Sequence, residues 1–178
     1  LGALRGGSHV HVFSPDGSRL SFTYNDHLMH QLGAEFDQRN VGVAVPLHNV
    51  VVEPQNPREY GGSHFCVLAS STVTDPEAGS DQISRAYEEG WVGTQGYLNA
   101  DGSVQRWALA FIGNTKAEDG SMLPEVFIVD LPESLADYAV EGELPLSGTE
   151  TSLPAPPAGV KQRRLTYTGD RRYPGVVT

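Results

Sequence analysis

Near its start the chain runs Ser8-His9-Val10-His11-Val12-Phe13, then Ser14-Pro15-Asp16-Gly17, then Arg19-Leu20-Ser21-Phe22-Thr23-Tyr24. The first six residues include valine and phenylalanine, which favour strands, and the last six alternate polar with apolar. The four residues between them have the composition of a tight turn, with proline second and glycine last. This stretch predicts a β-hairpin and decides the fold class.

Parts of this pattern recur later in the chain. Residues 97–103 and 106–112 predict a second hairpin around the Asp101-Gly102 turn. This turn follows the first after about two periods of a ~40–45-residue repeat. Gly6-Gly7-Ser8-His9 also recurs as Gly61-Gly62-Ser63-His64, and an apolar strand follows each copy. Both echoes predict a repeated sheet unit.

Further strands are predicted at residues 41–45, 49–52, 125–131 and 161–167. One helix is predicted from Asp75 to Glu89, because Ile83 and Tyr87 share a helical face and Gly90 follows as a stop signal. The expectation is therefore an all-β protein with one short helical insertion.

The composition agrees with this class and excludes others. Twenty glycines and 12 prolines in 178 residues are typical of many short strands joined by turns. The formal net charge of −10 argues against a nucleic-acid surface. No stretch approaches the ~18 apolar residues of a membrane span. The single cysteine, Cys66, excludes a disulfide framework.

A family resemblance rests on the first hairpin. Residues 13–22 resemble the Ser-Pro-Asp-Gly hairpin of TolB-type β-propeller repeats, which are related to WD-repeat blades. Residues 126–131 and 163–166 are similar to the third and fourth strands of such a blade. Most of the chain, including residues 88–93 and 158–160, resembles the uncharacterised bacterial YidR-like propeller proteins. A more distant resemblance is to the oligogalacturonate lyases.

The resemblance implies a β-propeller, which closes only with about four to eight four-stranded blades. At ~40–45 residues per blade, 178 residues supply at most about four blades, and two or three when the helix and the loops are allowed for. We therefore expect residues 1–178 to be part of a single propeller domain. One blade is expected at residues 6–60, and residues 61–178 form either one blade or two with an insertion. The expected partner is the remainder of the propeller or a second chain.

A metal site is one hypothesis for the histidines. His9 and His11, at i and i+2 of a strand, are expected to share one face. His64 would join them if it opens the equivalent strand of the next blade, giving three ligands for Zn, Mn, Fe or Ni. The lyase resemblance implies a His-x-His pair with a further His and a Gln, but Gly6 stands at the Gln position. Alternatively, the imidazoles hydrogen-bond between blades or line a water channel.

A second candidate cluster follows the second strand of the hairpin. Asn25 and Asp26 are candidate ligand-binding residues, and Asp26 could orient His27 as a general base. The alternative is that Asn25 or Asp26 caps a helical turn at residues 28–32. His27 or Arg5 is the candidate catalytic base.

Two functions follow from these patterns. The first is a non-catalytic binding module that takes a protein or a small ligand at the mouth of the propeller channel. The second is a metal-dependent lyase or hydrolase that acts on an anionic sugar such as a uronate. Neither needs a nucleic acid or a membrane span. The composition fits a soluble protein, and the resemblance to the YidR-like proteins implies a bacterial protein of the cytoplasm or the periplasm.

Overall fold

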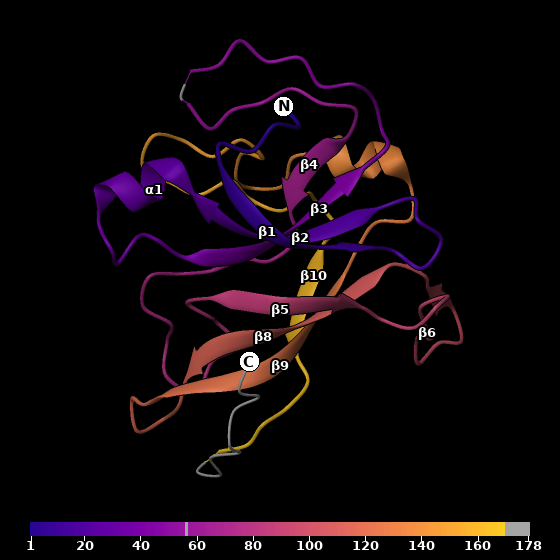
Figure 1. The fold of residues 1–178 in the computed structure, drawn as a ribbon. Coiled ribbons are helices and arrows are strands. Elements are labelled where there is room, and N and C mark those ends of the chain that lie inside the picture. Colours follow the sequence, from indigo (N-terminus) through magenta and orange to yellow (C-terminus); the bar gives the residue numbers. More distant parts are fainter. Residues whose placement is uncertain (56, 170–178) are drawn as a thin grey trace.

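The computed structural model describes residues 1–55 and 57–169. Two four-stranded antiparallel sheets lie one above the other (Figure 1). The strands of the first sheet follow one another in chain order: β1 (Gly6–Phe13), β2 (Leu20–Asp26), β3 (Arg39–Val45) and β4 (Phe65–Leu68). Those of the second are β5 (Ala86–Trp91), β8 (Ala108–Lys116), β9 (Met122–Asp130) and β10 (Lys161–Arg164).

The smaller elements lie in the connections. A two-stranded ribbon, β6 (Tyr97–Leu98) with β7 (Val104–Gln105), is inserted between β5 and β8. The helices are α1 (His27–Leu32) and the 3-10 helix η1 (Leu135–Ala139). Within the described ranges no helix has the length and apolar character to cross a membrane. The mostly-β prediction is confirmed, and the described strands form no closed sheet.

The first hairpin is confirmed, and its turn chemistry recurs at two further places. In each Asp-Gly-Ser turn the aspartate Oδ1 accepts the backbone N–H and the hydroxyl of the serine. Each glycine has a positive φ, between 71° and 84°, which costs glycine least. The three turns join β1 to β2, β6 to β7 and β8 to β9: Asp16-Gly17-Ser18, Asp101-Gly102-Ser103 and Asp119-Gly120-Ser121.

The helix predicted from Asp75 to Glu89 is wrong. Its last four residues lie in β5, where Ala86 pairs with Gly113 and Tyr87 with Ile112. The spacing of Ile83 and Tyr87 matches a helical face by coincidence, because pairing with β8 overrides a weak local propensity. Among the described residues the one α-helix is α1, at the position of the predicted helical turn.

The repeated Gly-Gly-Ser-His segment does not mark equivalent strands. The first copy opens β1 and the second precedes β4, and these strands form opposite edges of the same sheet. Because β4 pairs with β3, the first sheet also extends past the expected blade boundary at residue 60. The predicted strand at residues 49–52 is reduced to one bridge, between Val50 and Gly62.

A different repeat relates the two sheets. In β1 the pairing with β2 skips between His9 and Val12, so that Val10 and His11 lie opposite Phe22. In β5 the pairing with β8 skips between Tyr87 and Gly90, so that Glu88 and Glu89 lie opposite Phe111. Each is a β-bulge, and its first residue, Val10 or Glu88, has a φ of 55°. The first strand of each sheet is therefore built alike.

The main core lies between the sheets. Val41, Val43 and Val45 of β3 belong to one buried cluster with side chains of the second sheet, including Leu109, Phe111, Phe127 and Val129. A smaller cluster covers the other face of the first sheet, which we call the outer face: Phe22, Tyr24, Ala44 and Leu68, with Leu4, Leu20 and Cys66 packed against them.

The two sheets use unlike faces where they meet. By the shared bulge, Phe111 corresponds to Phe22, yet Phe111 packs in the core between the sheets while Phe22 lies on the outer face. The residues paired with Thr23 and Ser21, compared with their equivalents in the second sheet, show the same exchange of faces. Val41 and Val43 pack in the core, whereas the corresponding Val126 and Ile128 lie on the far face of the second sheet. The two sheets therefore stack head to tail. The face of the first sheet that meets the second sheet corresponds to the second sheet's far face.

Candidate functional site

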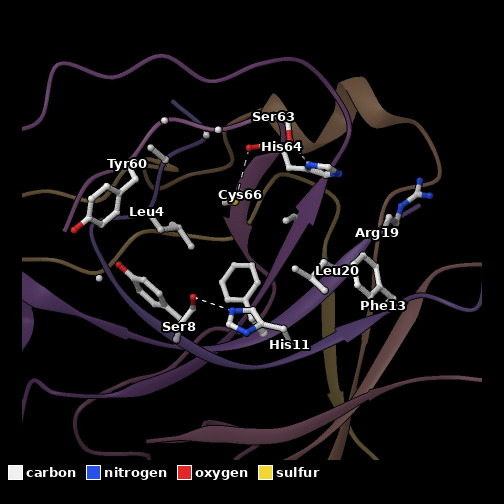
Figure 2. A pocket seen from close by; sticks show the side chains of 18 of the residues that line it. Leu4, Ser8, His11, Phe13, Arg19, Leu20, Tyr60, Ser63, His64 and Cys66 are labelled. Atoms are coloured by element: carbon white, nitrogen blue, oxygen red, sulfur yellow. Dashed lines mark hydrogen bonds between the residues drawn. The ribbon is translucent and has the colours of Figure 1, made fainter. Parts of the chain in front are cut away.

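A cavity of about 410 Å³ lies on the outer face of the first sheet. Its floor is apolar and includes Leu20, Phe22 and Ala44. Its walls come from β1, from the residues before β1 and from residues 58–64, and Cys66 of β4 borders it. Figure 2 shows Ser8 and His11 facing this space from one side and Ser63 and His64 from the other.

The bulge in β1 decides which histidine lines the cavity. His9 pairs with Thr23, whose side chain points toward the second sheet, whereas His11 lies opposite Phe22 on the outer face. The ring centres of His11 and Phe22 are 6.3 Å apart. The expectation that His9 and His11 share one face is therefore wrong, because one extra residue in the strand reverses the alternation.

Each histidine of the cavity is paired with a serine. The Ser8 hydroxyl lies 3.1 Å from Nε2 of His11, and the Ser63 hydroxyl lies 2.9 Å from Nδ1 of His64. A serine hydroxyl hydrogen-bonded to an imidazole is also part of a catalytic nucleophile–base arrangement, which needs a third group to orient the imidazole. Both pairs are exposed, and no hydrogen bond to a described carboxylate orients either ring. The pairs therefore act as hydrogen-bonding groups on the rim of an apolar cavity.

The proposed metal ligands are only partly brought together. His11 and His64 border the cavity, and His9 is outside its lining. Across the described ranges, no three side chains of His, Cys, Asp or Glu are placed so that they could hold a metal ion. The metal site stays a prediction from the sequence. Of its three proposed ligands, His11 and His64 line the same cavity.

Asp26 is the centre of a buried network. Its Oδ2 accepts from Nε of Arg5 at 2.9 Å and from the hydroxyl of Tyr24 at 3.0 Å. Its Oδ1 accepts the backbone N–H groups of Leu28 and Met29 and so caps α1. The capping alternative for Asp26 is confirmed. Burial, together with the neighbouring charge of Asp26, raises the pKa of Tyr24 far above its ordinary value.

The other candidates of this region lie around that network. Arg5 is buried, and its Nη2 donates to the carbonyl of Ser152, which ties the start of the chain to a distant loop. His27 begins α1, and its backbone N–H donates to the Arg5 carbonyl. The Asn25 side chain donates to Asp37. Arg5 and Asp26 are thus held in structural contacts, and their proposed roles in catalysis and ligand binding stay predictions from the sequence.

Glu89 is a residue that the sequence analysis missed. It lies in the bulge of β5, only 5% exposed, and its Oε2 accepts the Thr23 hydroxyl at 2.8 Å. Its Oε1 has no hydrogen-bond partner among the described atoms. Burial raises the pKa of this carboxyl group. In the sequence Glu89 ends the predicted helix, so no signal there indicates that this side chain faces the core.

Cys66 provides a chemical probe of the cavity. Its pKa is raised to about 11 by burial, which leaves roughly a hundredfold less thiolate at neutral pH than an ordinary thiol has. We expect iodoacetamide to alkylate Cys66 about a hundredfold more slowly than it alkylates glutathione at pH 7.5, and at the ordinary rate in 8 M urea. Mass spectrometry of timed samples measures both rates. Equal rates in the folded and unfolded protein contradict the partly buried placement of Cys66.

Comparison with known proteins identifies a homologue, but neither match has an assigned activity. Residues 1–60 match the family described as "Protein of unknown function (DUF3748)". The chain is 59% identical over 176 residues to "Uncharacterized protein YidR" of Escherichia coli (strain K12). It is a close homologue of that protein. The match covers 99% of the chain and 40% of YidR. No solved structure matches the chain.

Proposed function

We propose that the two sheets are neighbouring blades of a β-propeller and that the chain serves there as a binding module. The observation that carries this proposal is the head-to-tail stacking of two sheets with the same strand order and the same bulge. An interface between unlike faces leaves one face open at each end of the stack, and such stacks close only as rings.

Both open faces present apolar side chains, as expected for surfaces that pack against another sheet. The outer face of the first sheet presents the apolar cavity, and Phe13 at its border is 69% exposed. The far face of the second sheet carries Ala110, Ile112 and Val126, which are only half buried. Since the chain spans 40% of the length of YidR, we propose that further blades of the same protein cover these faces.

The bulged strands would then line the centre of the ring. All residues of β1 are at least partly exposed, and β1 and β5 are the edge strands that carry the bulges. Non-glycine residues with a positive φ, here Val10 and Glu88, are costly and gather where a protein binds or acts. A protein or small ligand held at the mouth of this channel is the function that we propose.

The chain by itself offers a test of the docking faces, because its own far face can substitute for the missing blade. We expect concentration-dependent self-association in sedimentation velocity. Phe13→Glu is expected to weaken the association about tenfold, since it places a charge on an apolar contact. Because Phe13 is mostly exposed, the substitution leaves the fold intact.

Val51→Glu is the matched control. Val51 is 91% exposed and lies outside the cavity lining, so this variant is expected to associate like the unchanged chain. A chain that stays monomeric at all concentrations, or an equal effect of both substitutions, contradicts the docking of a sheet on the outer face.

A further inference from the structure

A second cavity lies at the other end of the first sheet. Its volume is about 380 Å³, and it is bordered by α1, the start of β3, the residues that follow β4 and the loop at residues 151–156. No residue lines both this cavity and the one on the outer face. The loop is held in place by Arg5, which donates to the carbonyl of Ser152.

The lining of this second cavity is uncharged. The chain has 12 basic and 22 acidic residues, yet none of them is among the described residues that border this space. A charged ligand would lose its hydration here without gaining an opposite charge, and that exchange is unfavourable. The cavity therefore selects neutral molecules.

One wall is a ladder of amide and hydroxyl groups. The Gln38 amide donates to the Thr74 hydroxyl at 3.0 Å, and the Asn40 amide donates to the Thr72 hydroxyl at 3.0 Å. Thr72 in turn donates to Oε1 of Gln38 at 2.7 Å. These bonds fix the side chains, since Gln38 and Asn40 are both buried.

The ladder keeps hydrogen-bonding capacity. A side-chain amide nitrogen carries two N–H groups. Among the described residues, the amide nitrogens of Gln38 and Asn40 each donate one hydrogen bond. The Thr74 hydroxyl accepts one bond and can also donate. Because Asn40 is fully buried, the groups that can contact oxygen atoms of a ligand are the second N–H of the Gln38 amide and the Thr74 hydroxyl.

The remaining lining is apolar. Met29 is buried below the ladder region, Phe36 is partly exposed and Leu153 comes from the loop. A row of fixed donors beside apolar side chains matches a molecule with hydroxyl groups on its edge and C–H groups on its face. Binding sites of this kind use few polar groups for orientation and apolar area for affinity.

We propose that this cavity binds a neutral polyhydroxylated ligand, of the class of an uncharged sugar or cyclitol. The hydroxyl groups of the ligand accept from the Gln38 amide and the Thr74 hydroxyl, and its C–H face lies against Phe36. This site is separate from the outer face and from the channel, so it does not depend on the propeller proposal.

Saturation-transfer NMR on the chain tests the ligand class. The probes are the methyl glycosides of glucose, galactose and mannose, myo-inositol, and the uronate that matches each glycoside. We expect at least one neutral probe to bind with a dissociation constant of about 10 mM or below. The matching uronate is expected to bind at least about tenfold more weakly, because no cation compensates its carboxylate.

Two variants test the location. Thr74→Val removes one hydroxyl of an exposed residue without changing its shape, and Phe36→Ala removes the apolar face. Each is expected to weaken binding by about three- to tenfold. Val51→Ala is the control and is expected to bind normally, because Val51 is 91% exposed and lines neither cavity. The proposal is overturned if no neutral probe binds, if the uronates bind equally well, or if Val51→Ala lowers affinity as much as Phe36→Ala.

Discussion

Asp26→Ala is expected to lower the free energy of unfolding by about 4 kcal/mol. The substitution leaves the Arg5 guanidinium buried without its counter-charge, a change that typically costs 3–5 kcal/mol. It also removes the cap of α1, which is worth about 1 kcal/mol. For a chain of this size the melting temperature is expected to fall by roughly 8–16 °C. Urea unfolding followed by circular dichroism measures the loss.

Asn25→Ala on the same strand is the control. Asn25 makes one side-chain bond, to Asp37, so a loss of only about 1 kcal/mol is expected. The double variant, Arg5→Met with Asp26→Ala, is expected to lose less stability than the sum of the two single variants. Each single variant leaves one buried charge without its partner, whereas the double variant leaves none. Additive costs would contradict a coupled Arg5–Asp26 pair.

Glu89→Gln is expected to stabilise the chain by about 1–2 kcal/mol at pH 8, because it removes a buried carboxylate that makes one hydrogen bond. Burial holds the pKa of Glu89 above its ordinary value. The stability that this group contributes is therefore fully present below the ordinary carboxyl pKa. It is lost as the pH rises through the higher pKa of the folded state. The difference between the two proteins is expected to grow from pH 4.5 to pH 8.

Glu88→Gln is the matched comparison, because Glu88 is the exposed neighbour in the same bulge. It is expected to change the stability by less than about 0.5 kcal/mol at either pH. A Glu89→Gln effect that does not vary with pH would show that the carboxyl group does not titrate between the sheets.

Local patterns were predicted well. The hairpin of β1 and β2, strand β3, strand β9 and the cap by Asp26 were all expected from residue types and spacing. Each depends on neighbours in the chain: a turn favours glycine, aspartate and proline at set positions, and a cap needs a side-chain oxygen before the first turn. The histidine faces were not predicted, because a bulge has no clear local signal when its first residue is Val10.

The sequence by itself determined the class of the fold: short antiparallel strands, Asp-Gly turns and an acidic chain that resembles YidR. Only the tertiary structure decided that the segment expected to be a helix is β5, and that His9 and His11 face opposite sides. It also decided which strands are equivalent, since the bulges relate β1 to β5 and not to β4. The physical reason is the same in each case. Strand pairing joins residues that are distant in the chain, and one extra residue in a strand exchanges its two faces.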